Sequence, residues 1–197
     1  MLRLTGGVVR RLLRTPVTWV ALALLAVAGV FGLYWFQPWK LFTSNQVSDT
    51  VPIVAPAPGT AAPSGPAVPS GPATSAVPAG NRLLAQGSFI THEHATSGDV
   101  QLVQLADGRR QLVLRNLSTS DGPDLRVWLS DQAVVEGVAG WRVFDDGAWV
   151  ELARLRGNKG NQVYDVPAGV DLSRYRSVSI WCKRFAVSFG AAPLSPA

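Results

Sequence analysis

The sequence VQLVQLADGRRQLVLR, residues 100–115, decides the fold class. Apolar and polar residues alternate in Val100–Leu105 and nearly alternate in Gln111–Arg115, and a period of two is typical of a β-strand with one buried face. The dipeptide Asp107-Gly108 lies between the two segments and favours a tight hairpin turn, because glycine adopts positive φ without strain. This stretch therefore predicts a β-hairpin.

Short segments of the same kind continue through residues 82–197. They are rich in β-branched and aromatic residues and are separated by turn residues: Ser88–Thr91, Leu125–Leu129, Trp149–Leu155, Gln162–Val166, Val178–Cys182 and Phe185–Phe189. Eight short strands with few helical stretches predict an all-β domain, a β-sandwich or a barrel-like fold. Its four tryptophans are expected mostly to pack in the core or at its edges: Trp128, Trp141, Trp149 and Trp181.

The segment around Cys182 breaks the alternation. The apolar faces of VSIWC, residues 178–182, and FAVSF, residues 185–189, coincide only if the chain inserts an extra residue. Lys183-Arg184 does not suit a two-residue hairpin turn, because such a turn requires residues that tolerate positive φ. The sequence therefore favours a β-bulge over a hairpin. A bulge would bring two cations near the thiol, and these would favour the thiolate if the sulfur were accessible.

An uncharged apolar segment, Val17–Phe36, precedes the β domain. As a helix rising about 1.5 Å per residue it spans the roughly 30 Å hydrocarbon core of a bilayer. Four arginines precede this segment and only Lys40 closely follows it, so the positive-inside rule predicts a cytoplasmic N-terminus and an extracytoplasmic β domain. A cleaved signal peptide with a site at Ala26-Val27-Ala28 is the alternative, but apolar residues continue past that site. A single-pass anchor in the cell membrane is therefore favoured.

Residues 37–81 are predicted to form a disordered linker. Residues 51–80 contain eight Pro, four Gly and eight Ala, and no charged residue occurs between Thr50 and Asn81. Such a composition cannot bury a core and favours extended conformations. The interpretation is a stalk that lifts residues 82–197 off the membrane.

The distribution of charge argues against a nucleic-acid partner. The chain carries a net charge of +5, but residues 1–16 account for +4 and residues 82–197 for only +1. A surface that tracks phosphates needs a basic patch on the folded domain.

The candidate redox and metal-binding residues are few. Cys182 is the only cysteine, so it is a buried hydrophobe, half of an intermolecular bond, or a reactive or cofactor-binding thiol. His92 and His94 are the only histidines, and their i, i+2 spacing places them on one face of an extended segment. Together the three residues suggest a copper site. A haem would need a histidine, with His94 as the candidate, or Cys182, because Met1 is the only methionine.

No motif for hydrolysis or nucleotide binding accompanies these residues. The sequence lacks G-x-S-x-G, H-E-x-x-H, the phosphate loop and the dinucleotide fingerprint. Too few catalytic partners are therefore visible to name a reaction for a stand-alone enzyme.

An ordered set of motifs resembles the DM-thirteen domain, a family found beside DOMON domains. The motifs span roughly residues 83–194: SDGPDL at 120–125 with VWLS at 127–130, LRGNKGNQ at 155–162 with Tyr164, and VSIWC at 178–182 with Phe185 and FGA at 189–191. The resemblance implies a β-rich domain that takes part in electron transfer. It also implies that Cys182 is the family's hallmark cysteine, either a bare thiol or a ligand to a cofactor such as haem. The expected electron partner is another protein of the cell envelope.

Two hypotheses follow. In the first, the chain is a membrane-anchored extracytoplasmic redox module that acts through Cys182. In the second, it is a non-redox β-sandwich that binds a protein, a polymer or a small ligand at the envelope, with Cys182 buried and with the turns Gly122–Asp124 and Gly157–Asn161 as exposed contacts. Accessibility of the thiol distinguishes the two.

Overall fold

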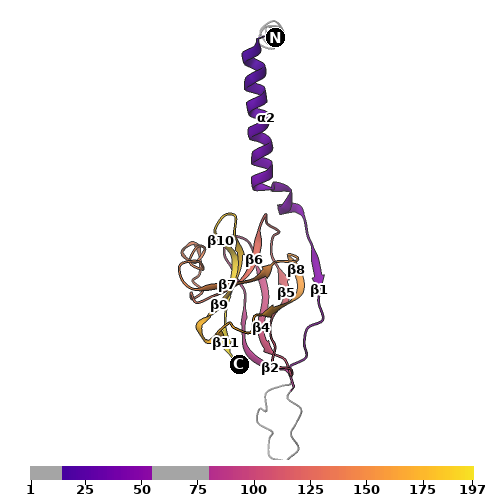
Figure 1. Ribbon diagram of the computed structural model, residues 1–197, viewed down its shortest axis with the longest axis vertical. Coiled ribbons are helices and arrows are strands. Elements are labelled where there is room, and N and C mark those ends of the chain that lie inside the picture. The colour runs from indigo at the N-terminus through magenta and orange to yellow at the C-terminus, as the bar shows by residue number, and fades with distance from the viewer. Residues whose placement is uncertain (1–14, 55–79) are drawn as a thin grey trace, which may run out of the picture. The chain divides into compact units, whose positions relative to one another are not determined.

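The computed structural model describes residues 15–54 and 80–197 (Figure 1). Most of the predicted cytoplasmic N-terminus, residues 1–14, and the centre of the predicted linker, residues 55–79, lie outside the described residues. The chain divides into two compact units, one that ends at Phe42 and one from Thr43 to Ala197.

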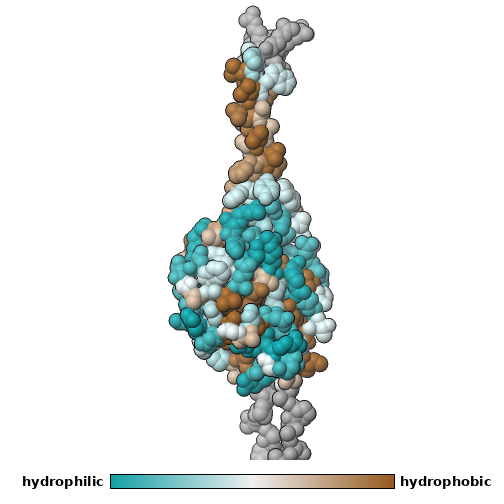
Figure 2. Space-filling view, in the orientation of Figure 1, coloured by the Kyte–Doolittle hydropathy of each residue, from teal (hydrophilic) through white to brown (hydrophobic). Residues whose placement is uncertain are grey.

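The first unit contains helix α2, Pro16–Phe36, followed by the 3₁₀ helix η1, Pro38–Phe42. Proline at the first helical position suits a helix start, and Gln37 ends α2 in the left-handed conformation. No residue of α2 is buried, and Figure 2 shows apolar side chains over most of its surface. In the described part of the chain it is the one helix long and apolar enough to cross a bilayer.

The second unit consists of two packed β-sheets, which confirms the prediction of an all-β sandwich. The first sheet contains, in spatial order, β1 (Gln46–Ser48), β8 (Lys159–Val166), β5 (Arg110–Ser118), β4 (Ser97–Gln104), β2 (Arg82–Ser88) and β11 (Ser195–Pro196). The second contains β3 (Ile90–Thr91), β10 (Val187–Pro193), β9 (Ser177–Cys182), β6 (Leu125–Ser130) and β7 (Trp149–Arg154). Two further 3₁₀ helices are η2, Val138–Gly140, and η3, Leu172–Arg174.

The predicted hairpin at residues 100–115 is confirmed as β4 and β5. The two strands pair antiparallel up to Gln104 and Arg110, and Leu105 N–H donates to Arg109 O at 2.8 Å across the turn. Gly108 has φ +85°, the positive value that the Asp-Gly signal anticipates.

The prediction of a bulge rather than a hairpin after Cys182 is wrong. Strands β9 and β10 form a hairpin in which Cys182 pairs with Val187 around the loop 183–186. Phe185 N–H donates to Cys182 O at 3.2 Å, and Ala186 supplies the left-handed conformation with φ +48°. A four-residue loop therefore closes where a two-residue turn cannot. The bulge lies further on, at Phe189, where the register shifts between Ser188 and Gly190.

The main core lies between the two sheets, where alternate residues of both sheets interdigitate. Leu112 and Leu114 of β5 and Val127 and Ile180 of the second sheet have no exposed surface. Burying a side chain of this size stabilises the fold by roughly 1.5–3 kcal/mol.

The outer face of the second sheet is also covered, by the loop 131–148. Phe144 of this loop packs against Trp128, Trp181 and Ala191 in a second, smaller apolar cluster. Ser130 Oγ donates to Phe144 O at 3.0 Å, and buried side chains thus hold the loop on the sheet. A loop of this length without much secondary structure needs such attachments to stay ordered.

Strand β1 comes from the interval that sequence reasoning placed in the linker. It pairs parallel with β8, with Val47 opposite Gly160. Figure 1 shows β1 alongside β8. Lys159 N–H donates to Asn45 O at 3.2 Å, and Asn45 N–H donates to Asn158 Oδ1 at 2.7 Å. The sheet domain therefore begins well before residue 82.

Asp49, just after β1, is held on the same sheet. Its carboxylate accepts hydrogen bonds from both terminal nitrogens of Arg156 and from Val163 N–H, the last at 2.8 Å. The Arg156 guanidinium in turn lies over the Tyr164 ring, 5.1 Å from its centre. The hydrogen bond from Arg156 is the main reason why the pKa of Asp49 is lowered.

Candidate functional site

Cys182 is the last residue of β9, and its side chain points into the core between the sheets with no exposed surface. Burial raises the pKa of the thiol, because the charged thiolate is disfavoured away from water. Backbone N–H groups of Phe185, Asp124 and Arg184 at the sulfur partly oppose this shift. Since the net direction is upward, the enclosed sulfur is a protonated thiol at neutral pH.

Lys183 does not act on the thiol in the way the sequence suggested. Its ammonium lies 3.3 Å from Glu151 Oε2, and its backbone N–H donates to Asp124 O at 3.0 Å. The groups that favour the thiolate are therefore backbone dipoles, supplied by the hairpin loop and by the turn before β6.

His92 is buried in a chain of hydrogen bonds on the outer face of the second sheet. Its Nδ1 lies 2.9 Å from Ser188 Oγ, which also accepts from Ser179 Oγ at 3.0 Å. Its Nε2 lies 3.1 Å from Val135 O, and because a carbonyl only accepts, Nε2 carries the proton. Burial lowers the pKa of His92, and the Val135 carbonyl opposes this only in part. The imidazole is neutral and structural.

His94 lies apart from this chain of hydrogen bonds. Its ring packs on Phe189 with the ring centres 4.0 Å apart, and its Nε2 is 3.5 Å from Glu93 Oε2. The two histidines thus have different partners although they lie two residues apart.

The three residues proposed as copper ligands, Cys182, His92 and His94, do not form a metal site. Among the described residues no three His, Cys, Asp or Glu side chains lie close enough together to hold a metal ion. Both ring nitrogens of His92 have hydrogen-bond partners, and Cys182 is fully buried in the main apolar core. The donor set present therefore does not fit copper, and neither His92 nor Cys182 offers a free ligand atom to a haem.

Acidification below about pH 6.5 is expected to destabilise the sheet domain through His92. The pKa of His92 is lowered by folding, so the unfolded chain binds a proton that the folded chain excludes. The free energy of unfolding should fall as pH drops below the ordinary histidine pKa, by at most about 1.4 kcal/mol per pH unit. Urea denaturation at several pH values between about 7.5 and about 5 measures this slope.

The matched variant is His92→Gln, which has no group that titrates in this range. Its stability should be nearly independent of pH in the same window. Carboxylates with a lowered pKa, such as Asp49 and Asp131, lose their contribution only at about pH 4 and below. An equal slope in wild type and His92→Gln would contradict the assignment.

Three tryptophans stack across neighbouring strands on the outer face of the second sheet. The rings of Trp128 on β6 and Trp149 on β7 are parallel within 3°, with centres 4.0 Å apart. Trp181 on β9 stacks on the other side of Trp128 at 5.0 Å. Each contact is between diagonal neighbours in the strand register, a geometry within reach of aromatic side chains. The sequence predicted tryptophan packing but gave no sign of this alignment.

A cluster of charged residues borders the stack. Arg126 donates to Glu151 Oε1 at 2.6 Å and to Asp124 Oδ1 at 2.8 Å. Trp128 Nε1 points to the other carboxylate oxygen of Glu151, 3.4 Å away. The indole, the carboxylate and the cations thus form one partly buried polar group at the edge of the sheet.

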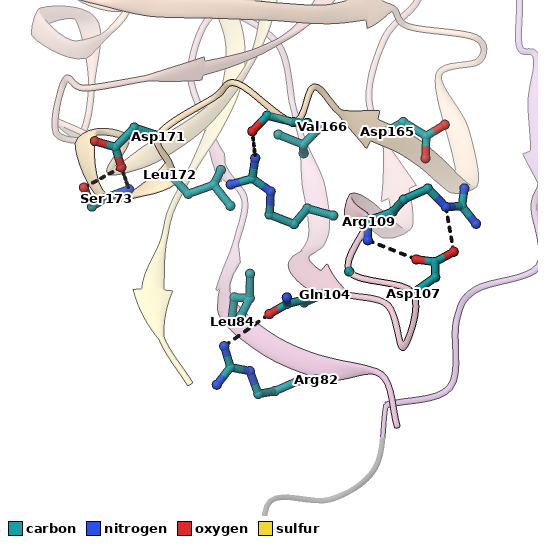
Figure 3. Close-up of a pocket in the computed structure, with 13 residues that line it drawn as sticks. Arg82, Leu84, Gln104, Asp107, Arg109, Asp165, Val166, Asp171, Leu172 and Ser173 are labelled. Atoms are coloured by element: carbon teal, nitrogen blue, oxygen red, sulfur yellow. Dashed lines mark hydrogen bonds and ion pairs between the residues drawn. The ribbon is translucent and has the colours of Figure 1, made fainter. Parts of the chain in front are cut away.

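A pocket of about 920 Å³ lies elsewhere in the sheet domain (Figure 3). It is open and is lined by the start of β2, the turn after β4 and the segment before η3. Its charged groups pair with their neighbours: Arg109 donates to Asp107, and Arg82 donates to Gln104 Oε1 at 3.2 Å. Neither Cys182 nor a histidine lines it, so it offers no redox chemistry.

The turns proposed as exposed contacts of a binding module are mostly covered. Gly122, Gly157 and Asn158 are buried. A Cβ at Gly157 would lie 2.5 Å from Asn45 O, so this glycine admits the chain that leads into β1. The motif at residues 157–161 therefore receives a strand of the same chain.

The fold and the site define a β-sandwich domain with one enclosed thiol, together with a helix of membrane-spanning length. A family model described as Electron transfer DM13 matches residues 88–194, more than half of the chain. The chain belongs to this electron-transfer family, as the sequence motifs indicated. No curated protein and no solved structure matches the chain.

Proposed function

We propose that the protein is a membrane-anchored, extracytoplasmic electron-transfer module whose reactive group is the Cys182 thiol. The observation that carries the proposal is the match to an electron-transfer family over the segment that contains the only cysteine. The length and apolar surface of α2, with arginines before it in the sequence, support the anchor and its orientation.

The proposed chemistry is exchange with a disulfide on a partner protein of the envelope. The Cys182 thiol loses its proton to water, and the thiolate attacks one sulfur of the partner disulfide. The S–S bond breaks, a mixed disulfide forms, and the other partner sulfur leaves as a thiolate. Two electrons pass between sulfur atoms, and no cofactor is required.

This exchange needs a transient opening above the sulfur. The cover consists of the loop 183–186 and the turn that precedes β6, whose N–H groups lie at the sulfur. Arg142 ties this cover to the loop 131–148 by donating to Phe185 O and Ala186 O, each at 3.1 Å. Loop openings cost less free energy than global unfolding, so the thiol can be reached without unfolding the sheets.

A non-redox binding module with a structural cysteine is the second candidate, favoured by the complete burial of Cys182. Under this alternative the thiol becomes accessible only when the domain unfolds, and partner binding does not depend on it.

Alkylation of the full chain in detergent separates the two candidates. The redox proposal expects slow labelling of native Cys182 by iodoacetamide and severalfold faster labelling of Arg142→Ala, because the variant frees the loop that covers the sulfur. Arg115→Ala is the matched control, since Arg115 pairs only at the surface with Gln101. Labelling of all three proteins at their global unfolding rate would overturn the proposal and favour the binding module.

A further inference from the structure

We propose that the stacked pair Trp128 and Trp149 is a one-electron redox site of this protein, in which Trp149 meets the oxidant and Trp128 releases a proton to Glu151. The inference rests on the proposed electron-transfer function but uses residues other than the thiol. The two can therefore fail separately.

The geometry of the pair suits a shared positive charge. Parallel rings 4.0 Å apart overlap through their π systems, so the charge left by the loss of one electron spreads over both indoles. Stacking of this kind is one of the arrangements that aromatic pairs prefer, and it keeps the faces of the two indoles in contact.

The two rings differ in access to solvent. Trp149, on the edge strand β7, is 40% exposed, whereas Trp128 is 3% exposed. An oxidant in solution or on a partner protein therefore meets Trp149 first. Trp128 is shielded from water, which protects a radical from side reactions.

Glu151 is positioned to take the proton that oxidation releases. Its Oε2 lies 3.4 Å from Trp128 Nε1, while Arg126 and Lys183 hold the carboxylate in place at 2.6 and 3.3 Å. In the proposed step a strong one-electron oxidant gains one electron from the pair. The Trp128 N–H bond then breaks, its proton passes to the Glu151 carboxylate, and a neutral indolyl radical remains.

Trp181 extends the stack toward the thiol. Its ring lies 5.0 Å from Trp128, and it directly precedes Cys182 in β9. Successive side chains of a strand point to opposite faces, so the stack and the sulfur lie on the two sides of one strand. The stack thus connects the exposed edge of the sheet to the residue beside the thiol.

Flash photolysis of the full chain in detergent tests the proposal, with tris(bipyridine)ruthenium(III) generated by light as the oxidant. Transient absorption and electron paramagnetic resonance should detect a neutral tryptophan radical in wild type. Trp149→Phe should slow its formation severalfold, and Trp128→Phe should remove most of the signal. Trp39→Phe is the control, because Trp39 is 50% exposed but lies in η1, outside the stack.

Glu151→Gln supplies a readout that a structural role would not change. Loss of the carboxylate should leave the radical cation spectrum in place of the neutral radical and remove the solvent isotope effect on its decay. Trp149 lies at the surface, so its variant keeps the test valid even if Trp128→Phe unfolds. Equal radical yields in wild type, Trp149→Phe and Trp128→Phe, or the same spectrum in Glu151→Gln, would overturn the inference.

Cys182→Ala distinguishes this inference from the thiol proposal. A radical that persists in Cys182→Ala, together with failed native alkylation of Cys182, supports the tryptophan site and rejects the thiol. Absence of the radical with normal alkylation rejects only the tryptophan site.

Discussion

Replacing Gly160 by alanine is expected to lower the free energy of unfolding of the sheet domain by about 3–4 kcal/mol. Gly160 has φ +95°, a conformation that side chains rarely adopt, and its alanine Cβ would overlap the carbonyl oxygen of Val47 in β1. The backbone penalty alone is about 1–2 kcal/mol, and relief of the overlap requires β1 to leave the edge of β8. Urea denaturation of the full chain in detergent, followed by tryptophan fluorescence, measures the loss.

Gly169→Ala is the matched control. Nothing lies within 4 Å of a Cβ at this position, and its φ is not positive. Its stability should stay within about 0.5 kcal/mol of wild type. If Gly160→Ala were as stable as Gly169→Ala, the pairing of β1 with β8 would be refuted.

Gln162→Ala is expected to cost about 3–4 kcal/mol by a different route. The buried Gln162 Oε1 accepts from Tyr164 Oη at 2.6 Å and from the N–H groups of Arg156 and Gly157 at 3.2 and 3.3 Å. Its Nε2 donates to Gly157 O at 2.7 Å. Truncation removes the acceptor of Tyr164 Oη and the partners of the Gly157 N–H and carbonyl, and it also opens a cavity, whereas the Arg156 N–H keeps Tyr164 Oη as an acceptor at 3.3 Å.

Gln101→Ala provides the comparison for this variant. Gln101 meets the exposed Arg115 side chain at 3.0 Å, so its loss should change stability by less than about 0.5 kcal/mol. Thermal unfolding should show the same order, with Gln162→Ala melting lowest. Similar melting temperatures for the two variants would show that the Gln162 network adds little to stability.

The β-sandwich could be predicted because the sequence signals for its strands and turns are local. Alternation in residues 100–115 and the turn at Asp107-Gly108 specify β4, β5 and their connection. The other predicted segments each overlap a strand of the structure. Apolar alternation reports which face of a strand is buried, and that is enough to distinguish a two-layer β fold from a helical one.

The path of the chain after Cys182 could not be read in the same way. The four-residue loop depends on a left-handed Ala186, and alanine carries no sequence signal for that conformation. The enclosed state of the thiol depends on packing from both sheets, which short-range patterns do not report. The family motifs identified Cys182, but its surroundings required the structure.

Two other features depend on pairing between distant segments. Strand β1 has only three residues, too few for a period-two pattern, and it is ordered by contacts with residues more than a hundred positions away. The stack of Trp128, Trp149 and Trp181 requires the strand order β7-β6-β9 and the diagonal register. The sequence shows that the domain contains these tryptophans, but it does not show that their rings align.

Strand β1 also changes what the Pro/Ala-rich segment connects. Both ends of that segment belong to the same sheet, because β1 precedes it and β2 follows it, and Asn81 Nδ2 donates to Ile53 O at 2.9 Å where the two ends meet. In the topology of the sheet, the segment is therefore an insertion between β1 and β2 whose described ends are tied together. Its contour length is therefore free to change during evolution without altering the covalent path from α2 to the sheet, which runs through residues 37–45 alone.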